Sequence, residues 1–506
     1  MRVTEMPNPH TSQIDRASIP EMVQQLGKAD GEIYGSPEWG PGLFDSVFLQ
    51  KLALLKERIA HTLKHPMGRV VLSGAGTSGR LALHAAAVYD SQTGPGQIVG
   101  LMAGGVNAFY HAAERVEDMP EIGVKDLTDI LPEEGPLVYV GITCGLSAAY
   151  VAGQACHAMK RKQAYTAVLG FNSLEDAARR PLSGMHGNFH SILQTLEADA
   201  SSCILNPIIG SEPITGSTRM KGGSATRIIL DCLLARTPIH DMLAISQQTQ
   251  NLFYQNGRHL KPLIEKASKA LIKGGGMVYL AGPREGLMAM LDASECPPTF
   301  GSSPHQVQAF VDSGFSTLLP HFPLNSFLLD AYTYKKWDAV FTMGQSNQLQ
   351  EACRDLPNAV HIHPAPMKEM LNSHSPALLS AASDLFLKWT LNAISTCAFI
   401  QCGKVYGNKM IDLKISNLKL WDRAARIVGE LGEVEPNEAN SLLKRAIGVE
   451  DSQDNQEIEA LIPIAVRSEK VVATAILMAR KAVSPEQARL HLTHHPKLRD
   501  SFHIGT

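Results

Sequence analysis

A segment from the first half of this 506-residue chain recurs, in altered form, in the second half. Residues 68–88 (GRVVLSGAGTSGRLALHAAAV) align without gaps with residues 275–295 (GGMVYLAGPREGLMAMLDASE). Each copy has a short β-branched run, a glycine-containing turn and an alanine-rich stretch, which predicts a strand followed by a helix. An internal repeat of this kind indicates that a structural unit was duplicated, so we expect two related domains.

Further strand-like runs follow each copy of the repeat. They are residues 98–103, 137–142 and 167–171 in the first half and residues 339–343 and 359–363 in the second. These runs alternate with helical stretches, a pattern typical of parallel sheets with helices on both faces. With 44% hydrophobic residues the chain can bury two or more cores. The sequence therefore predicts an α/β protein with two sheet domains in tandem.

The C-terminal part has a different pattern. Residues 375–402 have the composition of one long apolar helix, and the pattern beyond residue 404 is purely helical. There Ser484 and Gln487 have the spacing of a capping box, with a proline at the first helical position. We expect an N-terminal sheet domain with a helical arm at residues 1–250, a second sheet domain at 251–403 and a C-terminal helical lid at 404–506.

Composition excludes several classes of protein. A net charge of -3 without a long basic run gives no electrostatic footprint for nucleic acid or for an anionic membrane. The polar N-terminus lacks the features of a signal peptide, and no apolar run approaches the roughly 20 residues that span a bilayer. We therefore expect a cytoplasmic protein. The 8 cysteines include no Cys-x-x-Cys pair, which fits reduced thiols better than disulfides or a zinc site.

Residues 74–80 (GAGTSGR) lie between a predicted strand and a predicted helix and match the Gly-x-Gly-x-x-Gly pattern of dinucleotide sites. Such a site needs an acidic residue at the end of the second strand, but that strand ends in residues 102–105 (MAGG). A nucleoside-triphosphate loop is excluded too, since an Arg-Leu pair replaces the required Lys-Ser/Thr pair. What remains is a phosphate cradle made of backbone N–H groups and the Thr77 and Ser78 hydroxyls, or a tight turn with a purely structural role.

Two more stretches place hydroxyl groups at predicted helix starts. One is residues 142–147 (ITCGLS), and the other is residues 215–226 (TGSTRMKGGSAT), which adds two cations. Both could donate hydrogen bonds to a phosphate. Helix capping is the commoner use of Ser and Thr at such positions and remains the alternative for each stretch taken singly. Three such stretches in one domain favour a phosphate site.

At this point the residues match a known family. Residues 74–80, 214–223 (ITGSTRMKGG) and 291–301 (LDASECPPTFG) resemble signatures of the N-acetylmuramic acid 6-phosphate etherases. The two-domain layout resembles the glucokinase regulatory protein, a two-domain relative of these enzymes, as do residues 4–17 (TEMPNPHTSQIDRA), 140–154 (VGITCGLSAAYVAGQ) and 409–424 (KMIDLKISNLKLWDRA). The resemblance spans nearly the whole chain. It implies two tandem sugar-isomerase (SIS) domains with flavodoxin-like, five-stranded parallel sheets in a pseudo-two-fold arrangement.

The resemblance implies an etherase that converts N-acetylmuramic acid 6-phosphate into N-acetylglucosamine 6-phosphate and D-lactate. A base removes the C2 proton of the open-chain aldehyde, an acid protonates the ether oxygen on C3, and water then adds at C3. Two carboxyl groups in opposite protonation states suffice, without a metal or redox cofactor. By resemblance the base is Glu117, within residues 114–118 (ERVED), and the acid is Glu295. As alternatives, Glu117 is an exposed helix residue and Glu295 a buried structural partner.

Each copy of the repeat lacks what the other retains. In the first copy Val88 stands where the second copy has Glu295. In the second copy residues 283–286 (PREG) replace the turn at 76–79 (GTSG), and an apolar stretch at 318–324 replaces the glutamate-containing segment. If the single-domain relatives are dimers that share glutamates between subunits, a fused duplicate needs only one working site. The first domain would then supply the cradle and the base, and the second domain the acid.

The motifs and the resemblance together give a set of expected substrate-binding residues. They are Gly76, Thr77, Ser78, Gly79, Glu114, Thr143, Ser147, Ser217, Thr218, Lys221 and Lys419. Lys419 lies where both relatives carry a lysine that could hold the phosphate, although a lone lysine on a helix usually faces solvent. The histidines, among them His361 and His494, lack the spacing of a metal site, so we expect no metal.

Two functional classes remain open. The chain is an etherase, or it is a non-catalytic sensor that binds a sugar phosphate and regulates a sugar kinase. The intact DASECPPTFG string favours the enzyme, and a ketose–aldose isomerase on the same fold would not explain that string. We expect a small sugar phosphate as ligand, a sugar kinase as partner only for the sensor, no cofactor, and either a monomer with an internal pseudo-dimer or a homo-oligomer.

Overall fold

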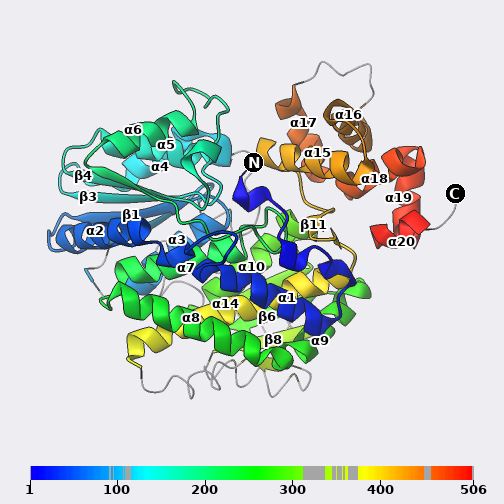
Figure 1. Cartoon of the computed structure of the whole chain (residues 1–506), viewed down its shortest axis with the longest axis horizontal. Coiled ribbons are helices and arrows are strands. Elements are labelled where there is room, and N and C mark those ends of the chain that lie inside the picture. Colours follow the sequence, from blue (N-terminus) through cyan, green and yellow to red (C-terminus); the bar gives the residue numbers. More distant parts are fainter. Residues whose placement is uncertain are drawn as a thin grey trace.

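The computed structural model describes residues 2–90, 93–94, 96–105, 108, 116–311, 337–344, 349, 356, 359–362, 374–449 and 457–503. Two parallel sheets wrapped by helices and a separate group of C-terminal helices make up this part of the chain (Figure 1). In Figure 1 the first sheet lies at the upper left, the second below it, and the C-terminal helices at the upper right. The α/β architecture with a C-terminal helical lid is therefore confirmed.

The first sheet has the strand order β2-β1-β3-β4-β5, with all neighbours parallel. Its strands are β1 (Arg69–Gly74), β2 (Ile98–Met102), β3 (Leu137–Ile142), β4 (Ala164–Leu169) and β5 (Ser202–Leu205). The direction of winding reverses between β1 and β3, and ligands of such sheets bind in the crevice at that point, beyond the carboxyl ends of the strands.

Alternating side chains of the first sheet bury into two layers of helices. Val71 and Tyr139 pack on one side and Val70 and Val140 on the other, as the two-residue period of a strand dictates. The helices around this sheet are α2 (Ser46–Thr62), α3 (Thr77–Asp90), α4 (Pro120–Ile130), α5 (Ala149–Met159), α6 (Phe189–Ala198) and α7 (Lys221–Leu234). In Figure 1, α4, α5 and α6 cover one face, and α2, α3 and α7 lie on the other.

The second sheet repeats the order of the first, with β7-β6-β8-β9 in the residues that the structure describes. Its strands are β6 (Met277–Ala281), β7 (Val307–Val311), β8 (Ala339–Met343) and β9 (Val360–Ile362). Its helices include α8 (Ile239–Gln255), α9 (Leu260–Ile272), α10 (Pro283–Phe300) and α14 (Pro376–Gln401). The predicted strand at 339–343 and the long helix at 375–402 thus occur in place, and β9 lies within the strand predicted at 359–363. Helix α8 spans the domain boundary expected at residue 250.

The two copies of the repeat contact each other directly. Helix α3 follows β1 and helix α10 follows β6, and these equivalent helices pack together where the two sheet domains meet. This gives the pseudo-two-fold arrangement that the repeat predicts. Helix α14 is 26 residues long and buried on nearly all sides, so it forms a common core for both domains.

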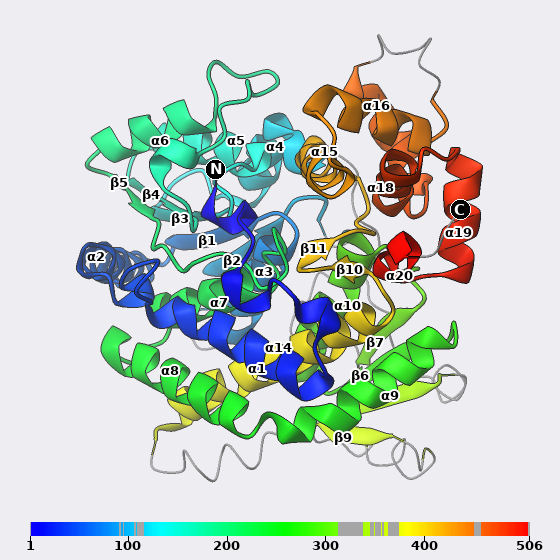
Figure 2. The ribbon, with the colours of Figure 1, turned by 45° about the vertical axis from the view of Figure 1, so that its right-hand side comes forward.

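The C-terminal helices stand beside both sheet domains (Figure 2). They are α15 (Leu418–Gly432), α16 (Pro436–Ala446), α17 (Ile458–Arg467), α18 (Val471–Lys481), α19 (Pro485–His494) and α20 (Leu498–His503), and a short hairpin of β10 (Val405–Tyr406) and β11 (Lys409–Met410) precedes them. The predicted capping box is present, because Ser484 Oγ accepts from Gln487 N at 3.3 Å and Gln487 Oε1 accepts from Ser484 N at 2.9 Å. None of the described helices combines the length and apolarity needed to cross a bilayer.

The N-terminal arm consists of short 3-10 turns from Val3 to Arg16 and is followed by α1 (Ile19–Gly31). In Figure 2 the arm and α1 (blue) run across the region where the two sheet domains meet. Thr4, Asn8 and Thr11 are polar but at most 1% exposed, so the arm is built into the fold.

Candidate functional site

A cavity of about 190 Å³ lies where the first sheet domain, the second sheet domain, the lid and the N-terminal arm meet. The segments after β1 and β3 form one side of it, at the switch point of the first sheet. Of the predicted site residues, the lining includes Gly76, Thr77, Ser78, Glu117, Thr143, Ser147, Ser217, Thr218, Glu295 and Lys419. Residues far apart in the sequence are thus brought together around one space.

The turn between β1 and α3 needs its glycines. Gly76 has φ +54°, a conformation that side chains disfavour, and a Cβ there would point at Glu295 Oε1 from 3.8 Å. A Cβ on Gly79 would lie 2.6 Å from the carbonyl oxygen of Gly74, so Gly79 lets the helix start close to the strand. Thr77 and Ser78 begin α3 and line the cavity, in the position expected for a phosphate cradle.

The second hydroxyl-containing turn serves two purposes. Thr143 Oγ1 accepts hydrogen bonds from Ser147 N at 3.2 Å and Ala148 N at 3.3 Å, so it orders the turn just before α5. The N-cap residue of α5 is Ala148, without a side-chain capping bond, so Thr143 does not cap this helix, and its own hydroxyl proton is still available to a ligand. Ser78 Oγ lies 3.6 Å from Cys144 Sγ, which joins this turn to the cradle.

The third motif divides between the cavity and the core. Ser217 and Thr218 line the cavity, but Lys221 does not. The Lys221 side chain is fully buried and pairs with Glu32, and the first amides of α7, Lys221 N and Gly222 N, donate to Glu212 at 2.9 and 2.8 Å. We therefore correct the expected role of Lys221: its charge is used in a buried ion pair, and the helix start is occupied by a carboxylate of the chain itself. Burial raises the pKa of Glu212 to about 7.

Glu295 reaches the cavity from α10 of the second domain. Its Oε1 lies 2.5 Å from Arg80 Nη1, and Arg80, 6% exposed, also donates to the carbonyl oxygen of Ala108 at 2.6 Å. Burial lowers the pKa of Arg80, and the charge of Glu295 counteracts this. The last residue of the GAGTSGR string thus holds the glutamate of the DASE string across the domain interface.

Glu117 enters from a short 3-10 turn, Val116–Asp118. Lys419 Nζ lies 2.6 Å from Glu117 Oε1, and Asn417 Nδ2 donates to Glu117 Oε2 at 3.4 Å. Both partners stand at the start of lid helix α15. Burial and the neighbouring charge of Glu117 raise the pKa of Asp118 to about 6. The predicted residue Glu114 lies outside the described residues.

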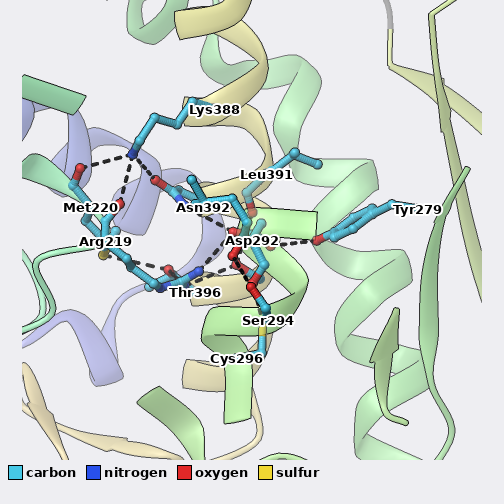
Figure 3. Close-up of polar contacts among 12 residues, drawn as sticks. Arg219, Met220, Tyr279, Asp292, Ser294, Cys296, Lys388, Leu391, Asn392 and Thr396 are labelled. Atoms are coloured by element: carbon cyan, nitrogen blue, oxygen red, sulfur yellow. Dashed lines mark hydrogen bonds and ion pairs between the residues drawn. The ribbon is translucent and has the colours of Figure 1, made fainter. Parts of the chain in front are cut away.

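A buried polar network, which no site prediction included, fixes α10 relative to the third motif (Figure 3). Arg219 Nη1 donates to Asp292 Oδ1 at 2.9 Å, and both side chains are 1% exposed. Asn392 and Ser395 of α14 donate to the same carboxylate oxygen at 3.0 Å, and Tyr279 donates to the other at 3.0 Å. The strings GSTRMK and LDASE are therefore linked through Arg219 and Asp292, two residues to which the expected chemistry assigned no role.

The arm and the lid supply further residues that line the cavity. Among them are Arg2, Thr4, Glu5 and Arg423. Thr4 and Glu5 belong to the string at residues 4–17 and Arg423 to the string at 409–424, and the sequence predicts no site role within these strings apart from that of Lys419. Within the part of the chain that the structure describes, His, Cys, Asp and Glu side chains form no group of three that could hold a metal ion.

Three family models match the chain. They are the glucokinase regulatory protein N-terminal SIS domain at residues 54–159, the second SIS domain of that protein at residues 254–321, and the C-terminal lid domain of glucokinase regulatory protein at residues 407–502.

The individual proteins that the chain resembles include both regulatory proteins and etherases. The glucokinase regulatory protein of Xenopus laevis is 27% identical, with 99% of this chain and 92% of its own length aligned. An N-acetylmuramic acid 6-phosphate etherase of Gloeothece citriformis is 31% identical, with 47% of this chain and 80% of its own length aligned. Among solved structures, tagatose-6-phosphate ketose/aldose isomerase from Escherichia coli is similar with 12% identity and a TM-score of 0.46, covering 78% of this chain and 95% of that chain.

Proposed function

The chain belongs to the family of the N-acetylmuramic acid 6-phosphate etherases and the glucokinase regulatory protein, and on this premise we propose that it binds a phosphorylated sugar and regulates a sugar kinase. The ligand occupies the cavity between the two sheet domains and the lid. The observation that carries the proposal is the extent of similarity: the regulator aligns along 99% of this chain, whereas the etherase aligns along 47%. The lid, for which a regulator model matches, supplies Lys419 and Arg423 to the cavity.

The donors around the cavity suit a phosphate dianion. Hydroxyls of Thr77, Ser78 and Ser217 line it, together with the start of α3 and the ammonium group of Lys419. Hydroxyls, helix N-termini and lysines are the groups that proteins commonly use for phosphate monoesters. The sugar ring then lies toward Glu117 and Glu295, which accept hydrogen bonds from its hydroxyls.

The contact between Arg80 and Glu295 supports binding more directly than catalysis. The side chain of Arg80 forms an ion pair with Glu295, and that of Lys419 forms one with Glu117. An ion pair with a cation engages a charged carboxylate, whereas a general acid has to carry a proton. A sensor needs no proton donor at Glu295, and the ion pair of Glu117 with Lys419 fits either candidate, because a base is charged too.

Calorimetric titration tests the ligand. The chain is titrated with a hexose 6-phosphate, with N-acetylmuramic acid 6-phosphate and with the unphosphorylated sugars. We expect one phosphorylated sugar per chain and no binding of the unphosphorylated controls. A sugar kinase from the same organism is then assayed with and without the chain, and we expect its rate to fall and the fall to depend on the phosphorylated sugar. A kinase rate that the chain leaves unchanged under all these conditions contradicts the regulatory role.

The etherase is the second candidate, and one observation favours it. Glu117 from the first domain and Glu295 from the second line the same cavity, as a base and an acid acting on C2 and C3 of one sugar would have to. Base removal of the C2 proton and protonation of the C3 ether oxygen would release D-lactate, and water would then add its hydroxyl at C3 and a proton at C2. Incubation with N-acetylmuramic acid 6-phosphate and an enzymatic assay of D-lactate decide between the candidates.

A further inference from the structure

The N-terminal arm joins the first sheet domain to the lid with side chains of its own. Thr4 N donates to Asn172 Oδ1 at 3.1 Å, and Asn172 Nδ2 donates to the carbonyl oxygen of Cys144 at 3.2 Å. The arm is thereby tied to the turn after β3 that lines the cavity. Thr11 Oγ1 donates to the carbonyl oxygen of Pro213 at 2.6 Å, just before the third motif.

Glu5 makes the arm's contact with the lid. Arg423 donates to both of its carboxylate oxygens, from Nη2 at 2.5 Å and from Nε at 3.0 Å, and Arg426 Nη2 lies 2.5 Å from Oε2. The Glu5 side chain is 11% exposed and that of Arg423 7%. Burial alone would raise the pKa of Glu5, but Arg423 and Arg426 lower it to about 2. The pair therefore stays charged throughout the neutral range.

The position of Arg423 is fixed from the opposite side as well. Gly216 of the third motif has φ +75°, and a Cβ there would lie 2.5 Å from Arg423 Nε. The guanidinium of Arg423 thus lies between the carboxylate of Glu5 and the backbone of Gly216, where a side chain would leave no room for it. Because Arg423 lies one helical turn after Lys419 on α15, holding one cation orients the other.

We propose that Glu5 is a positioning residue for the phosphosugar site, which clamps lid helix α15 through Arg423 and Arg426 so that Lys419 and Arg423 stay at the cavity. The inference rests on the proposed function for its ligand, although the clamp itself can be measured without one. It gives the string at residues 4–17 a role: the N-terminal arm sets how tightly the lid closes on a bound sugar phosphate. The N-terminus lies between the first sheet domain and α15, as this requires (Figure 1).

The chain offers a matched control on the same arm. Asp15 pairs with Arg499 of α20 at 2.7 Å, with side chains 8% and 19% exposed. This second ion pair also joins arm and lid, but neither residue lines the cavity. Removing it loosens the arm without changing the cation held at the site.

The experiment compares Glu5→Gln, Arg426→Met and Asp15→Asn in the full chain. A hexose 6-phosphate is the probe, and its Kd and dissociation rate are measured beside the hydrogen exchange of residues 418–432 and the thermal midpoint. We expect Glu5→Gln to raise Kd by the roughly 5- to 150-fold typical of coupled sites, mainly through faster dissociation, and to speed exchange in α15. Arg426→Met should change both quantities in the same direction, and Asp15→Asn should leave Kd within about twofold, since distant sites are nearly independent.

Two results overturn the proposal. If Glu5→Gln and Asp15→Asn change Kd equally, or if Glu5→Gln lowers only the thermal midpoint, the arm is a structural staple. If the unsubstituted chain binds no phosphorylated sugar, the proposed function fails, and hydrogen exchange then decides the clamp alone: unchanged exchange in α15 of Glu5→Gln and Arg426→Met rejects it.

Discussion

Asp292 receives the guanidinium of Arg219 at 2.9 Å in the interface between the two sheet domains, with both side chains 1% exposed. Asp292 stands three residues before Glu295 on the same helix, and Arg219 stands directly after Thr218 of the cavity. The pair therefore fixes the distance between the second domain's glutamate and the first domain's hydroxyls.

The first prediction follows from this burial. Asp292→Asn leaves Arg219 charged and without its carboxylate, and breaking a buried pair on one side typically costs about 3–5 kcal/mol of stability. Thermal and denaturant unfolding should show an early transition. The control is Asp129→Asn, which breaks an exposed pair with Lys125 and should cost about 0.5 kcal/mol or less. Equal shifts for the two variants would refute the role given to Asp292.

The second prediction concerns the cradle. Ser78→Glu places a carboxylate where the phosphate is expected, and repulsion between the two anions should abolish binding of a hexose 6-phosphate in calorimetry. Ser201→Glu, at an exposed position before β5, is the matched control and should bind as the unsubstituted chain does. If Ser78→Glu retains its affinity for the hexose 6-phosphate, the phosphate does not bind at the start of α3.

The third prediction separates the two glutamates and applies to the etherase candidate. Without its base, Glu117→Gln should stop D-lactate release and also stop the exchange of the C2 hydrogen with solvent deuterium. Glu295→Gln retains the base, so deuterium should still enter C2 while lactate release falls by about 10²- to 10⁴-fold, the usual contribution of general acid catalysis. If both variants lose exchange to the same degree, the two roles are assigned wrongly.

The fourth prediction is a pH dependence. Burial and the charge of Glu117 raise the pKa of Asp118 to about 6 from its ordinary value of 3.8, so the folded chain binds this proton more tightly than the unfolded chain does. Stability is therefore lost as pH rises from about 4 to about 6, and the loss is complete above that range. Asp118→Asn cannot lose a proton and so avoids this loss of stability. The thermal midpoint of the variant minus that of the unsubstituted chain should therefore increase between pH 4 and 6 and stay constant above pH 6.

Much of the fold could be predicted from local pattern. The β-branched run at residues 69–74 and the alanine-rich stretch after it form β1 and α3, because strand period, glycine turn and helix composition are all local properties. The same holds for the capping box at Ser484. Thr77 and Ser78, which the sequence predicts as a phosphate cradle, line the cavity, and their turn lies within the repeat itself.

Partners from distant segments could not be predicted in this way. Lys221 looked like a phosphate ligand from its neighbours in sequence, but its charge is taken by Glu32, a residue of another element that only the fold brings near. Glu5 and Arg423 likewise stand at opposite ends of the chain, and neither has a local feature that names the other. Burial of an ion pair depends on tertiary packing, which periodicity does not encode.

The cavity takes Ser78 and Glu295 from the two halves of one continuous polypeptide. A site shared between separate subunits comes apart when the protein is diluted below the dissociation constant of those subunits, and its apparent affinity then varies with protein concentration. Covalent linkage holds these two halves at a fixed effective concentration at any dilution. The ligand concentration that half-fills this cavity therefore does not depend on assembly of the two halves, even for a chain present at a few copies per cell.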